Sequence, residues 1–512
     1  MKKILFIASA ILILLSGCEN FLDSELLTEK TTANFPETEK DAQEMVTAIY
    51  AHLLFESPET SSQYYIAQLA GDDCLGGNLS YSNNCATNFL MYSGNLNTFA
   101  GIWDRCYTLI NRANNAINTM ENVKSWSSES ERNRLFGESY FLRAMAYYEL
   151  AQVFGGVPLR TTLESTNLPR ASVDEIYTQI AADLKNAIEM MPAKIYPKGS
   201  DMTGHATKYA AEAMMARVFL FYTGRYEKNE LPNGTTKEEV ISWIDDCVNN
   251  SGHKLVSDQR NIWAYTNDAT EDNTEGFRYQ YVINHNLKWE GNSSDETLFA
   301  NKHNLTYTWF SNTCAQFYSP SADNYSNKDS YPFGTGWGAG PVSPAMVNEW
   351  KDWAAKQTYT DGYKEDPRLT GSIWSYKALD PNVAGNVLMD CTMDEGEPEY
   401  TVSYRYYEQT GYFQKKYINI NSYNEGKIEP FGKQMFPGIS SQTSQQLLQI
   451  ADLIHIRFAD VLLMQSELKQ DATGLNKVRA RSHLAPVAYS LEAIKQERRW
   501  ELAFESIRWW DI

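Results

Sequence analysis

Three stretches of the sequence carry the residue types that bind sugars. A sugar presents apolar C–H faces and hydroxyl edges, so its site needs exposed aromatic rings beside carboxylate or amide groups. The acidic stretch, GDDCLGGNLSYSNN at 71–84, offers Asp73, Asn78 and Tyr81 among glycines. The first aromatic stretch is NLTYTWF at 304–310, and the second is SYPFGTGWGAGP at 330–341. Together the aromatic stretches supply Tyr307, Trp309, Tyr331, Phe333 and Trp337 as candidate ligand contacts.

Trp337 is the ring most strongly expected on the surface. Glycine and proline surround it, so little helix or sheet is predicted there that could bury an aromatic side chain. Trp103, by contrast, falls on the apolar stripe of a predicted helix. Packing of each candidate ring against the scaffold stays open as the alternative to ligand contact.

No pattern in the sequence specifies catalysis or a bound metal. Asp and Glu number 64, but no spacing singles out a pair of carboxylates that could hydrolyse a glycoside. GxSxG, HExxH and P-loop patterns do not occur, and the seven histidines are scattered. The acidic run DCTMDEGEPE at 390–399 misses the calcium-loop pattern. We therefore predict a protein that is not an enzyme, with no catalytic residue, no metal and no cofactor.

The charge of the chain makes nucleic acid a poor partner. The formal net charge is −19, and phosphates would be repelled by it. After the N-terminal apolar run, no stretch approaches 18 uncharged apolar residues, and the mean hydropathy is −0.47. We therefore expect the body of the protein to be soluble and exported.

The N-terminal segment is typical of a lipoprotein signal. Lys2 and Lys3 precede the apolar run ILFIASAILILL at 4–15. As a helix this run extends about 18 Å, too short for a hydrocarbon core of about 30 Å. It ends in LSGC at 15–18, which matches the lipobox of bacterial lipoproteins. We expect cleavage before Cys18 and lipid attachment at that residue; an ordinary secretory signal with a chance cysteine is the alternative.

Six further cysteines follow Cys18, and none forms a CxxC pair. An exported location permits disulfides, but their connectivity cannot be read from spacing. Cys74 and Cys85 are close enough in sequence to staple one loop, so a bridge between them and free thiols both stay open.

Helical periodicity dominates the first half of the chain. Apolar residues recur at helical spacing, a capping box begins at Ser172, and Gly155-Gly156 followed by Pro158 predicts a helix end. The predicted helices cover 38–55, 99–120, 129–154, 173–191 and 206–224. Their lengths suggest degenerate tetratricopeptide-like repeats, although the strict 34-residue signature is absent and a general helical bundle is the alternative.

The pattern changes after residue 250. Asn, Tyr, Trp, Gly and Pro crowd the region 251–445, where short stretches such as GYFQKKYINI read as strands. Helices are predicted again at 454–469, 475–484 and 490–512. The last of these carries a charged stripe, which is usually a solvated face; packing of the stripe against the scaffold is the alternative. The final RWWDI has no cap or polar tail, so we expect a clipped end.

Several motifs together resemble the SusD/RagB family of nutrient-binding lipoproteins of Bacteroidetes. They occur in family order and span nearly the whole chain. The matching segments are CENFLD after the lipobox, INRANNAI, GESYFLRAMAYYELAQVFGGVPL, ATKYAAEAMMARVFLFYTG, DGYKEDPRL, IRFADVLLMQSELK, LNKVRARSHL and ERRWELAFESIRWWDI. These are scaffold motifs, and they do not name ligand residues.

The resemblance implies a mainly α fold and a binding function. The scaffold would consist of degenerate tetratricopeptide-like helical repeats, with a loop-rich middle region that contains a few short strands and carries the ligand site. The family is anchored on the outer face of the outer membrane and works with a SusC-like TonB-dependent transporter. Its members bind oligosaccharides or other nutrients and are generally not enzymes.

We therefore expect a cell-surface lipoprotein that binds a glycan and delivers it to a SusC-like transporter. The alternatives are a member of the family that binds peptide or another nutrient, and a non-catalytic helical-repeat adaptor; a glycoside hydrolase is disfavoured. The expected divisions are a signal peptide at 1–17, a flexible tether at 18–36 and one discontinuous unit at 37–512. Within that unit, 37–250 and 446–512 form the scaffold and 251–445 the variable ligand-binding region.

Overall fold

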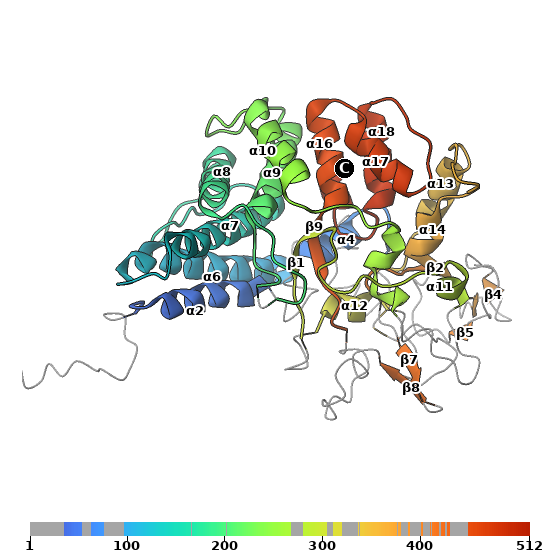
Figure 1. The fold of residues 1–512 in the computed structure, drawn as a ribbon, viewed down its shortest axis with the longest axis horizontal. Coiled ribbons are helices and arrows are strands. Elements are labelled where there is room, and N and C mark those ends of the chain that lie inside the picture. The colour runs from blue at the N-terminus through green and yellow to red at the C-terminus, as the bar shows by residue number, and fades with distance from the viewer. Residues whose placement is uncertain are drawn as a thin grey trace, which may run out of the picture.

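The computed structural model confirms a mainly helical fold with short strands (Figure 1). It describes residues 35–53, 63–75, 97–164, 166–200, 202–267, 280–304, 311–319, 336, 338–375, 377–379, 388–389, 401–402, 410, 412–418, 421–424, 427–430 and 449–512. Cys18, the lipobox and most of the predicted tether lie outside these residues. Within the described part of the chain, no helix combines the length and the apolar character needed to cross a membrane.

The first half of the chain is a row of helices, each packed on the next, as a tetratricopeptide-like scaffold requires. The elements of this half are α2 (Glu39–Tyr50), η1 (Ala51–Leu53), α4 (Gln63–Ala70), α6 (Asn97–Thr119), η3 (Met120–Asn122), α7 (Glu129–Phe154), α8 (Val173–Met190), α9 (Lys208–Tyr226) and α10 (Lys237–Asn250). Helix α4 lies outside the row, because it packs on the last helix of the chain, Arg508–Asp511. Helix α7 packs against both α6 and α8, so apolar side chains are buried around most of its circumference.

Local sequence signals set the ends of these helices. The Ser172 hydroxyl accepts from the Glu175 amide while the Glu175 carboxylate accepts from the Ser172 amide, which confirms the predicted capping box. Gly155 ends α7 with a φ of +71°, also as predicted. The predicted end of α9 at Gly224 is wrong, because the helix continues to Tyr226 before the chain turns left-handed.

The middle of the chain is built from short elements. They are η4 (Gln259–Ile262), η5 (Ala264–Thr266), α11 (Gln280–Asn284), β1 (Thr297–Asn301), α12 (Thr313–Tyr318), α13 (Pro344–Ala354), α14 (Pro367–Ser372), β2 (Ile373–Ser375), β3 (Lys377–Leu379), β4 (Leu388–Met389), β5 (Thr401–Val402), β6 (Tyr412–Gln414), β7 (Asn421–Asn424) and β8 (Lys427–Pro430). Strand β6 pairs antiparallel with β2, whereas residues 415–417 of the predicted GYFQKKYINI strand form a turn. Helix α13 lies where little helix was expected.

The C-terminal part returns to the scaffold through β9 (Leu453–Arg457), α16 (Phe458–Lys469), α17 (Thr473–Arg481), α18 (Leu491–Glu501) and α19 (Arg508–Asp511). Strand β9 pairs antiparallel with β1, which joins the C-terminal helices to the middle region. The prediction of helix from residue 454 is therefore wrong for four residues. The predicted 490–512 helix is also broken, because Phe504 and Ser506 adopt positive φ angles of 64° and 59°.

Burial decides between the alternatives left open at two places. The charged stripe of 490–512 is not a solvated face, since Glu497 and Glu501 are both 0% exposed. Packing against the scaffold, the alternative, is what the structure shows. The Cys74 thiol is free and buried, and it accepts a hydrogen bond from Gln68 at 3.0 Å, so it does not staple a loop with Cys85.

Candidate functional site

Seven of the eight candidate ligand contacts lie outside the described residues. They are Asn78, Tyr81, Tyr307, Trp309, Tyr331, Phe333 and Trp337. The structure does describe segments that flank the acidic stretch and both aromatic stretches. The positions of these flanking segments show whether the three stretches start from one region of the molecule.

The acidic stretch and the second aromatic stretch are joined by backbone pairing. Cys74 and Val342 form an antiparallel β-bridge. The Leu75 amide donates to the Pro341 carbonyl at 2.9 Å. Two segments far apart in the sequence are therefore fixed side by side.

The first aromatic stretch leads into α12, which contacts the same place. The Ala339 amide donates to the Phe317 carbonyl at 2.8 Å. Gly340 has a φ of +64°, and a Cβ at that position would lie 3.2 Å from the Tyr318 ring. Glycine at 340 thus lets the second aromatic stretch run directly against α12.

Strand β6 completes this junction. The Val342 amide donates to the Tyr412 carbonyl at 2.8 Å, and the Thr410 hydroxyl donates to the Val342 carbonyl at 2.7 Å. We call the convergence of residues 73–75, 317–319, 339–343, 410 and 412 the loop root. The acidic stretch and the second aromatic stretch contribute residues to it, and the first aromatic stretch is connected to it through α12.

Asp73 is the one candidate ligand contact that the structure describes, and it is 2% exposed. Its Oδ1 accepts from Arg499 Nε at 3.2 Å and from Arg499 Nη2 at 2.9 Å. Burial raises the pKa of Asp73 to about 6, while Arg499 opposes the shift. The expectation of a ligand hydrogen bond from Asp73 is therefore corrected, because its carboxylate is buried in a structural ion pair.

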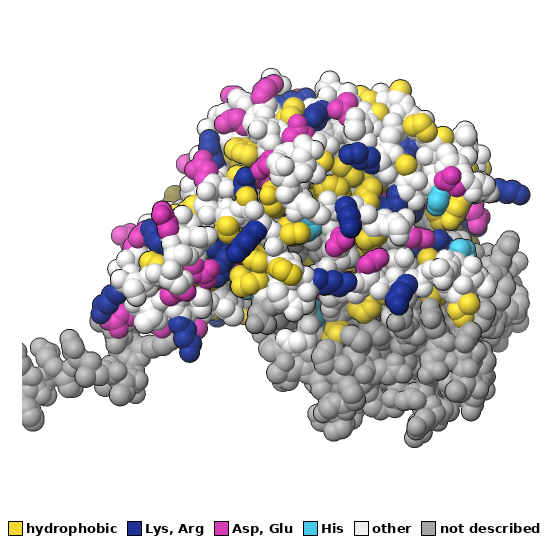
Figure 2. Space-filling view, in the orientation of Figure 1, with side chains coloured by type: hydrophobic (Ala, Val, Ile, Leu, Met, Phe, Trp, Pro, Cys, Tyr) yellow, Lys and Arg dark blue, Asp and Glu magenta, His cyan; other side chains and the backbone are white. Residues whose placement is uncertain are grey.

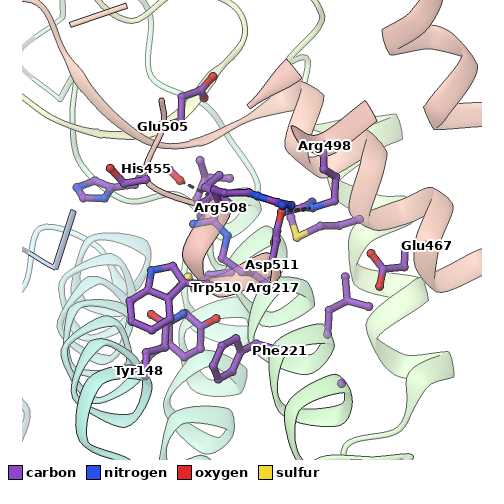
Figure 3. Close-up of a pocket in the computed structure, with 18 of the residues that line it drawn as sticks. Tyr148, Arg217, Phe221, His455, Glu467, Arg498, Glu505, Arg508, Trp510 and Asp511 are labelled. Atoms are coloured by element: carbon purple, nitrogen blue, oxygen red, sulfur yellow. Dashed lines mark hydrogen bonds and ion pairs between the residues drawn. The ribbon is translucent and has the colours of Figure 1, made fainter. Parts of the chain in front are cut away.

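A separate cavity of about 640 Å3 lies between two layers of helices, one from the first half of the chain and one from the C-terminal segment (Figure 3). One side comes from α7 and α9, and the other from β9, α16, α18 and α19. Figure 2 shows hydrophobic side chains exposed on this face, near the end of the chain. The lining includes Phe141, Met145, Tyr148, Phe221, Phe299, Ile456, Met464, Trp510 and Ile512.

The rings of this cavity pack edge to face against one another. Tyr148 and Phe221 lie 5.7 Å apart at 89°, and Phe221 and Trp510 lie 6.3 Å apart at 70°. The Arg498 guanidinium is held by Asp511 at 2.9 Å. Such rings stabilise the junction of the two layers and do not form the flat, open plate that a sugar face needs.

A network of buried ion pairs lies beneath α18. Arg368 of α14 donates to Glu497 at 2.5 Å and to Glu501 at 3.0 Å. Arg457 of β9 donates to Glu501 at 2.6 Å and to Glu296 at 2.7 Å. The network ties the middle region and β9 to the C-terminal helices.

The carboxylates of this network do not combine the two properties of a glycosidase acid, a raised pKa and access to the substrate. Burial raises the pKa of Glu497, but its side chain is 0% exposed and accepts from Arg368 and Arg479. Burial alone would raise the pKa of Glu501, but Arg481, Arg457 and Arg368 hold it well below its usual value. A general acid needs a raised pKa and access to the substrate. Glu501 has neither, and in the part of the chain that the structure describes no group of three His, Cys, Asp or Glu side chains could hold a metal ion.

Comparison with known proteins agrees with this fold. Residues 20–220 match a family model described as starch-binding and associating with the outer membrane, and residues 259–512 match the model of the SusD family. A SusD-like protein of Formosa agariphila is 24% identical, with 100% of this chain and 92% of the relative covered. A SusD-like protein of Bacteroides ovatus is 22% identical, with 100% and 82% covered. The chain belongs to the SusD family.

Solved structures show the same architecture. A structure titled as a laminarin-binding SusD-like protein aligns with a TM-score of 0.65 at 21% identity, covering 93% of this chain and 91% of the other. Surface glycan-binding protein A of Bacteroides thetaiotaomicron, in complex with laminarihexaose, aligns with a TM-score of 0.65 at 18% identity, covering 93% and 89%. At these identities the likeness concerns the fold.

Sequence reasoning missed the two arginines that hold the loop root. Arg499 binds Asp73, and Arg508 binds Asp72 through two hydrogen bonds of 2.7 Å. The acidic pair was visible in the sequence, but its partners lie more than 400 residues away in the C-terminal segment 490–512. No local pattern pairs the two sets.

Proposed function

We propose that this protein is a cell-surface lipoprotein that binds oligosaccharide or polysaccharide and delivers it to a SusC-like TonB-dependent transporter. Membership of the SusD family supports this proposal, since one of the matching models is described as starch-binding and associating with the outer membrane. Two similar structures, a laminarin-binding SusD-like protein and a surface glycan-binding protein in complex with laminarihexaose, favour a glycan as the ligand class.

The observation that carries the proposal is the loop root, where described residues of the acidic stretch and of the second aromatic stretch meet α12, the helix that follows the first aromatic stretch. The contacts that join them are the Cys74–Val342 bridge and the hydrogen bond from the Ala339 amide to the Phe317 carbonyl. We propose that the ligand binds above this root. The proposed contacts are Trp337, Trp309, Tyr331, Phe333, Tyr307, Tyr81 and Asn78.

The expected affinity suits capture and release. If each aromatic plate contributes about 0.5–1.5 kcal/mol, three plates give on the order of 2–5 kcal/mol, which corresponds to roughly millimolar binding. Hydrogen bonds at the rim would tighten it. A site of this strength retains a polymer that offers many sugar units and still releases it to a transporter.

The proposed anchor is lipid on Cys18, with residues 1–17 removed. A tether at 18–36 would reach roughly 60 Å if extended, at about 3.3 Å per residue. This reach would let the folded unit at 37–512 move over a transporter while it stays on the outer membrane. Within that unit we propose that 37–250 and 446–512 are scaffold and that 251–445 is the ligand-binding region. Release of the protein from cells by Cys18→Ala would support the anchor, and retention would contradict it.

We propose a non-catalytic role, because the buried carboxylates described above are held by arginines. The alternatives are a peptide-binding or other nutrient-binding member of the family and a helical-repeat adaptor. Incubation with polysaccharide for several hours, followed by a reducing-sugar assay, tests the absence of hydrolysis. Released reducing ends that increase with protein concentration would contradict it.

Calorimetric titration tests the binding proposal. The purified chain would be titrated with a panel of polysaccharides and oligosaccharides that includes laminarin and laminarihexaose, and with a matched panel of peptides. Binding of at least one glycan and of no peptide supports the proposal. Binding of peptides alone would favour the peptide alternative, and co-purification with a transporter without any ligand would favour the adaptor.

A further inference from the structure

The end of α4 is held to the C-terminal helices by three side-chain contacts. Asp72 and Asp73, directly after α4, bind arginines of α19 and α18. Gln68, on the last turn of α4, accepts from the Ser506 amide at 3.3 Å and donates to Cys74 at 3.0 Å. The segment that enters the acidic stretch is therefore fixed from the far end of the chain.

The contact between Asp72 and Arg508 is bidentate. Arg508 Nε donates to Asp72 Oδ1 and Arg508 Nη2 to Asp72 Oδ2, each at 2.7 Å. Two parallel bonds fix the orientation of both side chains, not only their separation. These hydrogen bonds lower the pKa of Asp72, so this carboxylate is ionised near neutral pH.

The contact between Asp73 and Arg499 extends to a third element. Arg499 Nη1 donates to Glu349 of α13 at 2.6 Å while Nη2 donates to Asp73 at 2.9 Å. The guanidinium also lies 4.7 Å from the Trp500 ring. One side chain thus links α18 to α13, which follows the second aromatic stretch, and to the residue that precedes the Cys74 bridge.

These side-chain contacts lie where the backbone of the acidic stretch pairs with the backbone at the end of the second aromatic stretch. The Asp73 carbonyl accepts from the Ser343 amide at 2.9 Å, and the Leu75 amide donates to the Pro341 carbonyl. Asp73 therefore bonds the arginine with its side chain and the root with its backbone. A shift of Asp73 would move the entry of the acidic stretch relative to the second aromatic stretch.

We propose that Arg499 and Arg508 are positioning residues for ligand binding: they clamp Asp72 and Asp73 so that the acidic stretch and the second aromatic stretch leave the loop root in the geometry that binds the glycan. The inference rests on the proposed function for its effect on affinity. It assigns a role to the charged C-terminal motif beyond stabilisation of the scaffold. The clamp residues do not contact the ligand.

Two measurements on the same variants test the clamp. Arg508→Gln and Arg499→Gln are each expected to lower the affinity for the best-binding glycan by about fivefold, equivalent to about 1 kcal/mol. Hydrogen exchange of the Leu75 and Ser343 amides, measured without ligand, is expected to become faster in both. Arg225→Gln, an exposed arginine that lies over Tyr226, is the control and should change neither.

A double-mutant cycle separates positioning from a general loss of stability. If Arg508 acts through Asp72, then Asp72→Asn combined with Arg508→Gln should lose about fivefold, as each single variant does, whereas independent effects would multiply to roughly 25-fold. Arg508→Lys, which keeps the charge but not the two parallel bonds, should recover part of the affinity.

Each outcome decides between the two proposals. Unchanged affinity in both single variants, with or without faster exchange, would overturn the positioning role. Multiplying losses in the cycle would overturn it as well, because the arginines would then act independently of the acidic pair. Failure of the unmodified protein to bind any glycan would refute the proposed function, while wild-type exchange rates at Leu75 and Ser343 in the variants would refute the clamp.

Discussion

Helix α18 makes ion pairs on two sides, and the two sides differ in burial. On the inner side, Arg368 and Arg457 bind Glu497 and Glu501 with all four side chains nearly inaccessible to solvent. On the outer side, Arg499 binds the buried Asp73 and also Glu349, whose side chain is 56% exposed. Asp72, which Arg508 of α19 binds next to this contact, keeps 48% of its side chain exposed. The same residue types thus build a scaffold on one side and a positioning contact on the other.

The difference lies in what replaces water around the charges. A buried carboxylate that loses its arginine keeps its charge without solvent, so removal of one partner is costly. An exposed carboxylate is resolvated when its partner is removed, and its pair contributes little to stability. We therefore expect the inner pairs to govern folding, whereas the half-exposed pair of Asp72 and Arg508 should affect ligand geometry more than stability.

The largest effect is expected from Arg457→Met. Loss of this guanidinium leaves Glu296, Glu501 and Glu505 with excess negative charge in the interior. The free energy of unfolding, measured by urea denaturation at pH 7, should fall by about 3–5 kcal/mol. Arg225→Met, at an exposed position, is the control. A change within about 0.5 kcal/mol for Arg457→Met would show that the network does not support the fold.

An intermediate effect is expected from a change of pH, because the pKa of Asp73 on the outer side is raised and the pKa of Glu501 on the inner side is lowered. Asp73, with its pKa raised to about 6 by burial, gains a proton between pH 7 and 5 and loses its ionic contact with Arg499. A raised folded pKa means that the folded state binds this proton more tightly, so protonation of Asp73 does not lower the free energy of unfolding. Glu501, whose pKa is lowered, loses its stabilising contribution only as the pH falls through that lower value.

Glycan affinity should therefore fall below about pH 6 with no matching loss of stability from these two carboxylates. The charged and titratable groups near Asp73 are Asp72, Cys74, Glu349, Arg499 and Arg508. Titration of wild type and Asp73→Asn at pH 7.5 and 5.0 tests the assignment, since the variant should lack the pH step. An equal step in both proteins would place the titrating group elsewhere.

The smallest effect on stability is expected from Asp72→Asn. Because this carboxylate is half-exposed, removal of its charge should lower the free energy of unfolding by only about 0.2–1 kcal/mol, even though the clamp predicts weaker ligand binding. Urea denaturation and glycan titration of one preparation provide both values. A loss of stability comparable to that of Arg457→Met would remove the distinction between the two sides of α18.

Local signals were enough to predict most of the scaffold from sequence. The Ser172 capping box and Gly155 determine helix ends through bonds among neighbouring residues, so they could be read directly. Strand β9 was missed because its pairing partner is β1, more than 150 residues earlier in the chain, while its own residues continue the apolar pattern of α16. Helix α13 was missed because its region is rich in aromatic residues and glycine.

The charged stripe of the C-terminal segment shows the limit of periodicity. Periodicity places Glu497 and Glu501 on one helical face, but it does not state what covers that face. The arginines that bind these two glutamates include Arg368 and Arg457, which are far from α18 in the sequence. Likewise, Asp73 resembled a ligand contact in the sequence because its partner, Arg499, lies 426 residues away.

The candidate ligand stretches could be chosen from their composition. Their spatial relation could not be predicted from the sequence. Composition identifies rings and amides that suit a sugar, but the Cys74–Val342 bridge depends on the complete fold. The loop root thus adds a spatial reason to treat three separate stretches as one site.

The central claim, a glycan site above the loop root, is tested most directly by Trp337→Ala. Calorimetric titration with the glycan that binds wild type best should show a loss of affinity of roughly tenfold, the upper range for one aromatic plate, while the melting temperature stays nearly unchanged. Trp309→Ala should behave in the same way. Unchanged affinity, or a strongly lowered melting temperature that marks these rings as core, would contradict the account.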